Sequence, residues 1–294
     1  MGKASRRRTT RPSHTDRLDG RPAPAPFVAR PFEGLPSETE WVALREILPA
    51  ATGSVTITAD GATIPATVCT VLPLAWPALH RNGGELFVAT QSGATSGDPS
   101  RDLAAALLLA ADVDEGTPVT LVPNPTVDTP RLQDILDTSA PFDVTVHEGF
   151  DFWVGEADLD ADGQQSLERA NESVIPTERV VEGESVYWCV INGRTYVRWV
   201  LPYDEDTATA ALARLHAAES DRLTPESRLL GAFRACGLLV PVWEVPGDTT
   251  AGDYPDAVAA MGAALSSATT EETPLTADER RARAGLLNRQ VTLR

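Results

Sequence analysis

The sequence contains one motif with the spacing of a calcium loop, Asp158-x-Asp160-x-Asp162, which is followed by a glycine. Alternating carboxylates before a bend can place several oxygen ligands around one Ca²⁺ ion. An EF-hand loop also requires Glu at its twelfth position, where this chain has Arg169. The three aspartates are therefore calcium candidates. The alternative is a solvent-exposed turn whose negative charge caps a helix over 164–174.

Acidic and aromatic side chains form two further clusters, at 148–153 and at 203–206. A groove lined by carboxylates with aromatic walls is suited to general acid/base chemistry, or to holding a basic segment of a partner. The candidate catalytic residues are His147, Glu148, Asp151 and Asp204. In the alternative interpretation the aromatic residues belong to the core, the acids lie at helix starts, and the histidine is a surface residue of a strand.

Lys3 is the only lysine in the chain, and this excludes several classes of enzyme. A P-loop, a pyridoxal-phosphate enzyme, a Schiff-base aldolase and a protein kinase each need a lysine inside a folded site. The sequence also lacks the His-x-His, His-Glu-x-x-His and Cys-x-x-Cys spacings of zinc sites and the Gly-x-Ser-x-Gly motif of serine hydrolases. We therefore expect no cofactor, and the balance favours a protein that is not an enzyme.

Charge is distributed unevenly along the chain. The formal net charge is −17, but residues 1–30 hold eight basic and two acidic residues. We expect residues 1–25 to be a disordered basic tail, because they are rich in Arg and Pro and poor in large apolar residues. Within it, Arg6, Arg7 and Arg8 are candidates for contacts with nucleic acid or a ribosome, and a solvated tail is the alternative. The acidic remainder is expected to repel polyanions and anionic membranes.

Several features of the sequence predict a cytoplasmic protein with no membrane partner. No apolar segment of a secretory signal follows the basic N-terminus, and the longest apolar stretch, 103–111, is too short to span a bilayer. The cysteines are few and widely separated, as expected for reduced thiols. They are Cys69, Cys189 and Cys236.

Apolar periodicity and capping residues predict several helices. They are expected at 99–111, 164–174, 205–218, 254–267 and 277–287, with another that ends at Leu48. The pairs Ser37/Glu40 and Thr276/Glu279 have the spacing of a capping box. Asp98, Thr129 and Thr224 each precede a proline in the arrangement of an N-cap followed by an N1 proline.

The clearest strands are 185–191 and 194–201, which are rich in Val, Tyr, Trp and Ile. Asn192-Gly193 lies between them. Asn-Gly is the strongest short signal for a two-residue hairpin turn, because both residues tolerate a positive φ. Asn82-Gly83 is expected to form a similar turn earlier in the chain.

Short landmarks recur in the same order in the two halves of the sequence. A Pro-Phe pair occurs at 26–27 and at 141–142, and a Pro-Val-x-x-Val-Pro motif at 118–123 and at 241–246. This recurrence predicts an α+β protein made of two related units with mixed or antiparallel sheets and a groove between them. Coincidence in a proline-rich chain is the alternative. The expected divisions are a tail at 1–25, units at 26–140 and 141–250, and a helical segment at 251–294.

Several segments resemble an actinobacterial family of unknown function, over residues 26–294. The segments are 26–36, 41–46, 71–80, 100–104, 149–153 and 274–285. Members of that family are sometimes labelled as related to the Sec translocase motor or to a topoisomerase. A translocase motor needs a P-loop lysine, and a topoisomerase needs an ATP site or a tyrosine nucleophile in a basic channel. The resemblance therefore implies a fold and no catalytic residue.

The favoured function is that of a non-enzymatic cytosolic interaction or regulatory protein, with an acidic body and basic ends. An as yet unidentified protein partner with basic character is expected for the groove or for the acidic faces. Two alternatives remain open at this point. One is an enzyme that uses carboxylates in the groove between the units, and the other is a protein that associates with ribosomes or nucleic acid through its basic tail.

Overall fold

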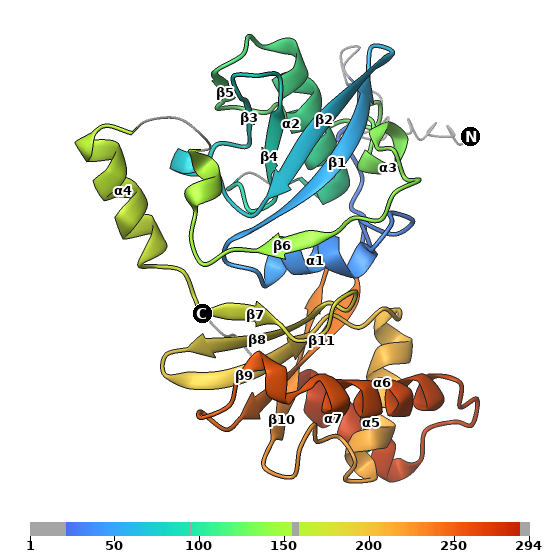
Figure 1. The fold of residues 1–294 in the computed structure, drawn as a ribbon. Coiled ribbons are helices and arrows are strands. Elements are labelled where there is room, and N and C mark those ends of the chain that lie inside the picture. Colours follow the sequence, from blue (N-terminus) through green and yellow to red (C-terminus); the bar gives the residue numbers. More distant parts are fainter. Residues whose placement is uncertain (1–21, 94–95, 155–158, 289–294) are drawn as a thin grey trace, which may run out of the picture.

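The computed structural model describes residues 22–93, 96–154 and 159–288. They form two lobes, each built on one β-sheet, that are stacked one above the other (Figure 1). Helices together with one mixed and one antiparallel sheet confirm the α+β class. Four of the candidate residues lie outside the described part of the chain: Arg6, Arg7, Arg8 and Asp158.

The first lobe contains a six-stranded sheet in the order β5-β3-β4-β2-β1-β6. β2 and β4 are parallel and the other neighbours are antiparallel, so the sheet is mixed. The strands are β1 (Ala51–Ala59), β2 (Ala62–Cys69), β3 (Ala78–His80), β4 (Leu86–Ala89), β5 (Thr117–Val119) and β6 (Val144–Val146). A short 3-10 helix, η1 (Pro73–Ala75), connects β2 to β3.

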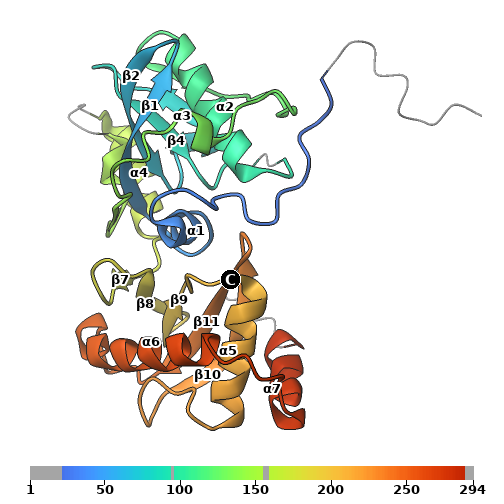
Figure 2. The same cartoon turned by 90° about the vertical axis from the view of Figure 1, so that its right-hand side faces the viewer.

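Three helices accompany this sheet: α1 (Glu38–Glu46), α2 (Pro99–Asp112) and α3 (Leu132–Ile135). α1 lies at the boundary between the lobes in both views (Figures 1 and 2). Its Trp41 is buried and stacks on Phe142, with ring centroids 4.1 Å apart. The same apolar core includes Tyr187, Leu238 and Val240 of the second sheet, so the two lobes share one continuous core across α1.

The second lobe contains a five-stranded antiparallel sheet in the order β10-β11-β9-β8-β7. Its strands are β7 (Thr177–Arg179), β8 (Val186–Ile191), β9 (Arg194–Trp199), β10 (Arg228–Ala235) and β11 (Leu238–Val245). One face packs on α5 (Glu205–Ala217), α6 (Pro255–Thr269) and α7 (Ala277–Asn288), around a core that contains Trp199, Leu212 and Trp243. In Figure 2, α6 lies in front of the strands, and α5 and α7 lie to the right of them.

The connection between the lobes carries two short helices. β6 leads to η2 (Asp151–Trp153), and α4 (Ala161–Asn171) precedes β7. α4 projects from the body at the left of Figure 1, and none of its residues is buried. A third 3-10 helix, η3 (Ala251–Asp253), precedes α6.

In the described part of the chain, two-residue turns close three hairpins. The prediction at Asn192-Gly193 is confirmed, since both residues have a positive φ and Ile191 pairs with Arg194. The same geometry occurs at 60–61 and at 236–237. The prediction at Asn82-Gly83 is wrong in detail, because His80 pairs with Leu86 and the loop between β3 and β4 therefore has five residues.

The longer helices start and end close to their predicted bounds. Some of the predicted caps are confirmed and others are wrong. Asp98 accepts a hydrogen bond from Ser100 N, and Thr276 and Glu279 bond to each other's backbone, as predicted. The capping box at Ser37 is wrong: this residue is left-handed, with φ 52°, and makes no side-chain cap. Thr224 is followed by a turn and a strand instead of a helix, and the N-cap of α3 is Arg131 instead of Thr129.

The internal duplication is not confirmed. The first sheet is mixed and six-stranded, whereas the second is antiparallel and five-stranded. β6 was expected in the second unit, from residue 141 onward, but it pairs with β1 in the first sheet. The chain therefore passes from the first sheet to the second between β6 and β7.

Candidate functional site

His147 lies directly after β6, in a loop that also holds Glu148 and leads into η2, which begins at Asp151. Its Nε2 is 2.8 Å from Thr52 Oγ1, and its ring centroid is 5.2 Å from that of Phe152. Burial lowers the pKa of the imidazole, and the Asp151 carboxylate acts in the opposite direction. His147 is half-buried, whereas Glu148 and Asp151 are exposed. This loop therefore presents a histidine whose neutral form is favoured beside two solvated carboxylates.

The aromatic residues of the same loop pack against the first lobe. Phe150 stacks on Trp153 with centroids 4.4 Å apart, and Trp153 Nε1 donates to Val71 O. Arg81 Nη2 donates to the carbonyls of Phe152 and Trp153, at 2.6 and 2.9 Å. These contacts fix the backbone of η2, so its aromatic side chains act as packing residues, in line with the alternative interpretation of the cluster.

Asp204 belongs to a different part of the molecule. It caps α5 by accepting a hydrogen bond from Thr207 N at 3.0 Å, and this bond lowers the pKa of its carboxyl group. Asp204 also forms a β-bridge with Leu238 of the second sheet. Figure 1 shows α5 and η2 on opposite sides of the molecule. The structure thus brings His147, Glu148 and Asp151 together and places Asp204 apart from them.

The described part of the acidic motif has a local role at the start of α4. Asp160 is the N-cap, and its Oδ1 accepts a hydrogen bond from Gly163 N at 2.8 Å. Asp162 lies in the first turn, where a negative charge stabilises the positive end of the helix. Among the described residues, no three His, Cys, Asp or Glu side chains gather closely enough to hold a metal ion.

The most highly coordinated carboxylate in the region between the lobes is Glu40, which the sequence had suggested as part of a cap. Arg179 donates to both of its oxygens, from Nη1 at 2.8 Å and from Nη2 at 2.9 Å. Ser185 Oγ and Tyr187 Oη donate to the same carboxylate at 2.6 and 2.7 Å. Glu40 is buried; the Arg179 guanidinium balances its charge, and two hydroxyl groups donate hydrogen bonds to it.

Arg179 links this group to both lobes. It also donates to the carbonyl oxygens of Val144 in β6 and of Glu184 in the turn after β7. Its guanidinium lies 5.1 Å from the centroid of the Tyr187 ring. Burial and the neighbouring Glu40 carboxylate raise the pKa of the Tyr187 phenol, so this side chain remains a donor at physiological pH. We call Glu40, Arg179, Ser185 and Tyr187 the inter-lobe hub.

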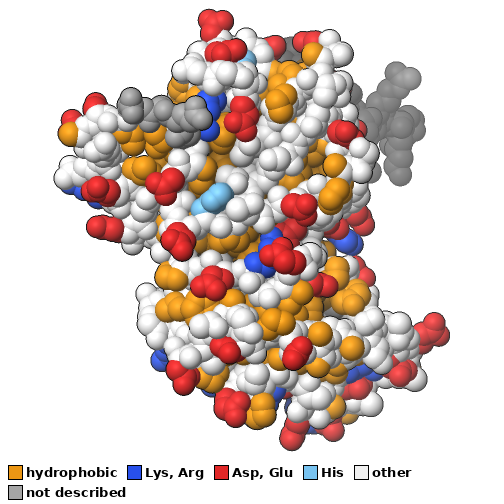
Figure 3. Space-filling model, viewed as in Figure 1, with side chains coloured by type: hydrophobic (Ala, Val, Ile, Leu, Met, Phe, Trp, Pro, Cys, Tyr) orange, Lys and Arg blue, Asp and Glu red, His pale blue; other side chains and the backbone are white. Residues whose placement is uncertain are grey.

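A cavity of about 380 Å³ opens beside the hub, between β6 and the turn that joins β7 to β8. Asp143 and Glu182 line it from the first and the second lobe, and both are exposed. Glu40 and Arg179 form part of its wall as a closed ion pair. Acidic side chains of both lobes lie around this junction (Figure 3). We call this space the inter-lobe cleft.

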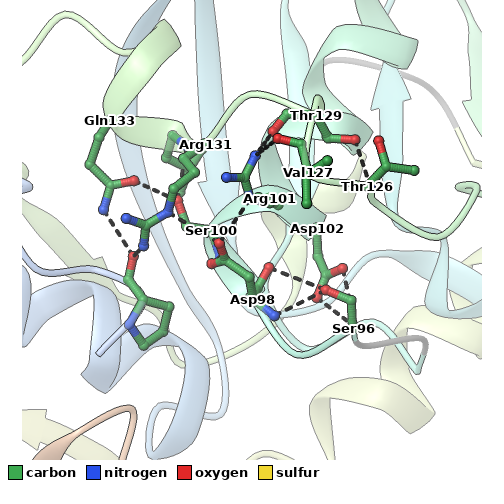
Figure 4. Close-up of polar contacts among 12 residues, drawn as sticks. Ser96, Asp98, Ser100, Arg101, Asp102, Thr126, Val127, Thr129, Arg131 and Gln133 are labelled. Carbon is green, nitrogen blue, oxygen red and sulfur yellow. Dashed lines mark hydrogen bonds and ion pairs between the residues drawn. The ribbon is translucent and has the colours of Figure 1, made fainter. Parts of the chain in front are cut away.

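A second buried ionic group lies at the start of α2 (Figure 4). Asp98 is fully buried, and its Oδ2 lies 3.2 Å from Arg101 Nε and 3.1 Å from Arg131 Nε. Arg101 also donates to the carbonyls of Val127 and Thr129. The network therefore fixes the 126–131 segment to the helix.

The same network holds the N-terminal segment of the described chain. Arg131 Nη2 and Gln133 Nε2 both donate to Pro31 O, at 2.6 and 2.9 Å. Ser100 Oγ donates to Gln133 Oε1 at 2.7 Å and accepts a hydrogen bond from Leu132 N. The polar groups of this network face one another. The network therefore anchors segments of the first lobe and does not resemble a ligand site.

With this geometry in place, comparison with known proteins assigns the chain to a family. The model of a family of unknown function, DUF5926, matches residues 31–294. The chain belongs to the DUF5926 family. The expectation of an uncharacterised family is thereby confirmed. No curated protein and no solved structure matches the chain.

The DUF5926 match spans both lobes, so the inter-lobe hub and cleft both lie within it. Within the described ranges, none of the helices combines the length and the apolar composition needed to cross a bilayer. Neither Glu40 nor Arg179 was identified from the sequence as a functional residue. No local pattern marks the pair, because its members are separated by 139 residues.

Proposed function

We propose that this DUF5926 protein is a non-enzymatic interaction or regulatory protein that holds a basic segment of a partner protein in the inter-lobe cleft. The observation that carries the proposal is the charge of the cleft. Its Arg179 is already paired with Glu40, whereas Asp143 and Glu182 are exposed in the same cavity. The cleft therefore offers net negative charge to an incoming guanidinium or ammonium group.

The positions of Asp143 and Glu182 favour a partner segment that contacts both lobes. Asp143 immediately precedes β6 of the first sheet, and Glu182 follows β7 of the second. A basic side chain placed between them gains from both charges at once. The formal net charge of −17 adds a long-range attraction that accelerates the encounter with a basic partner at low ionic strength.

The cleft can be tested with a fluorescently labelled hexa-arginine amide as the probe, by anisotropy at low and at high salt. The variant is Asp143→Asn/Glu182→Gln. Exposed charge contacts contribute about 0.2–1 kcal/mol each, so removing two weakens binding by about 2- to 30-fold. The loss is expected to shrink at high salt because the contacts are screened.

A matched control separates a defined site from general attraction to an acidic protein. Glu168→Gln/Glu172→Gln removes the same charge from two exposed positions, one in α4 and one at its C-cap. We expect this control to bind the probe almost as well as the wild-type protein. Equal weakening by the two double variants would show that only the overall charge attracts the peptide, and would contradict the proposed site.

A further inference from the structure

The second lobe contains another cavity, of about 370 Å³, on the helix-covered side of its sheet. It lies between the end of β9, the segment that leads from β9 into α5, and the first turns of α6. Its size falls within the range of small-molecule sites in proteins, about 300–1,000 Å³. Hydrophobic side chains gather on this face of the second lobe (Figure 3).

The walls of the cavity are aromatic and aliphatic. Trp199, Leu201 and Tyr203 come from the sheet side, and Val258 and Leu265 come from α6. Gly262 of α6 shapes the space between them. A Cβ atom at this position would lie 3.2 Å from Trp199 Cη2, so the glycine allows the indole to approach the helix closely.

The charged residues of the lining are both acidic. Glu184 and Asp256 are exposed, and neither Lys nor Arg contributes to the lining among the described residues. Asp256 lies in the first turn of α6 and is partly compensated by the positive end of that helix, whereas Glu184 lies in a turn. An apolar interior beside a carboxylate complements a molecule that has an apolar body and one positive charge.

We propose that this cavity binds a small amphiphilic organic cation, with its alkyl or aryl body against Trp199 and α6 and its ammonium group near Glu184 and Asp256. The aromatic ring of Tyr203 attracts the ammonium group through a cation–π interaction, in addition to the attraction of the two carboxylates. The proposal is independent of the inter-lobe cleft, because the acids that carry it, Glu184 and Asp256, do not line the cleft.

The probes are three molecules with the same eight-carbon chain: n-octylammonium, 1-octanol and octanoate. Isothermal titration calorimetry below their aggregation concentrations gives the order of affinity. We expect octylammonium to bind at least several-fold more tightly than octanol, and octanoate to bind most weakly. Equal binding of all three, or binding of none, would overturn the proposal.

Variants that fill the cavity test whether octylammonium binds inside it. Gly262→Leu fills the cavity and is expected to abolish octylammonium binding, and Ala259→Leu, at an exposed lining position, does the same with less strain in the core. Gly285→Leu is the matched control, since a Cβ on this α7 glycine meets no neighbour within 4 Å. Unchanged binding in a folded Gly262→Leu or Ala259→Leu protein would contradict the assignment.

A further double variant tests the preference of the cavity for a positively charged ligand. Glu184→Gln/Asp256→Asn removes both carboxylates and is expected to bring octylammonium down to the affinity of octanol, while octanol binding is retained. A preference for octylammonium that survives in this variant would contradict the role of the two acids. Binding of hexa-arginine to the cleft serves as an independent readout, and we expect it to be unaffected by Gly262→Leu.

Discussion

At the scale of single residues, Glu40 concentrates the interactions that join the lobes. Its carboxylate accepts hydrogen bonds from an arginine, a serine and a tyrosine that all belong to the second lobe. A buried carboxylate is stable as a charge only when it is paired and hydrogen-bonded. The hub therefore adds a buried ionic contact to the apolar core that joins the lobes.

Removal of that charge is expected to destabilise the protein strongly. Glu40→Gln leaves the half-buried Arg179 guanidinium without its counterion, and breaking a buried ion pair costs about 3–5 kcal/mol. Glu244→Gln, at the more exposed pairs with Arg194 and Arg228, is expected to cost less than about 1 kcal/mol. Urea unfolding measures both, and similar losses in the two variants would show that the hub is not specially stabilising.

Because the pKa of His147 is lowered in the folded protein, we expect the stability of the protein to depend on pH. Burial lowers its pKa in the folded protein below the ordinary value of 6.5, so the unfolded chain binds more protons in this range. The contribution of His147 to the free energy of unfolding therefore falls as the pH drops from above 6.5 through the folded pKa. Comparing urea midpoints at pH 7.5 and 5.5, we expect a smaller difference in His147→Gln than in the wild type. An equal or larger difference in the variant would contradict this role.

At the scale of elements, the turns and caps separate what local sequence determines from what it does not. Asn192-Gly193 forms the predicted turn because both residues accept a left-handed backbone. At Ser37, the spacing of a capping box is present, but Glu40 is drawn away by Arg179 of a distant strand. Such long-range competition cannot be deduced from a local motif.

Long-range contacts also decide where short strands are placed in a sheet. β6 has three residues and carries little periodic signal of its own, so its place beside β1 is set by tertiary contacts. The segments that form β8 and β9 are longer and rich in Val, Tyr and Trp, and these strands were predicted to within two residues of their ends. The candidate loop at His147 was found because its residue types are chemically distinctive, whereas the hub depends on partners far apart in the chain.

Two glycines give opposite predictions. Gly193 has φ +74°, so Gly193→Ala forces a side chain into the left-handed region and is expected to cost about 1–2 kcal/mol. Gly285 lies inside α7 with open space around its Cβ position, so Gly285→Ala is expected to stabilise the protein by about 0.4–1 kcal/mol. Thermal unfolding checks both signs, and a stabilising Gly193→Ala would refute the assigned turn.

At the scale of the whole molecule, two unlike sheets are joined by a shared apolar core and by the hub. The α+β class and most longer helices follow from composition and periodicity, but the duplicated arrangement was inferred from short landmarks. Such landmarks occur wherever prolines end strands, and they do not fix the order of strands in a sheet. This unequal arrangement creates the inter-lobe cleft beside the hub, and we propose that a basic segment of a partner binds there.

Hydrogen exchange with and without hexa-arginine tests that claim most directly, because it reports on both lobes at once. We expect slower amide exchange at 142–146 of the first lobe and at 179–185 of the second, with both effects lost in Asp143→Asn/Glu182→Gln. Protection that is confined to one lobe, that appears instead on α4, or that persists in this variant would contradict a basic segment held between the lobes.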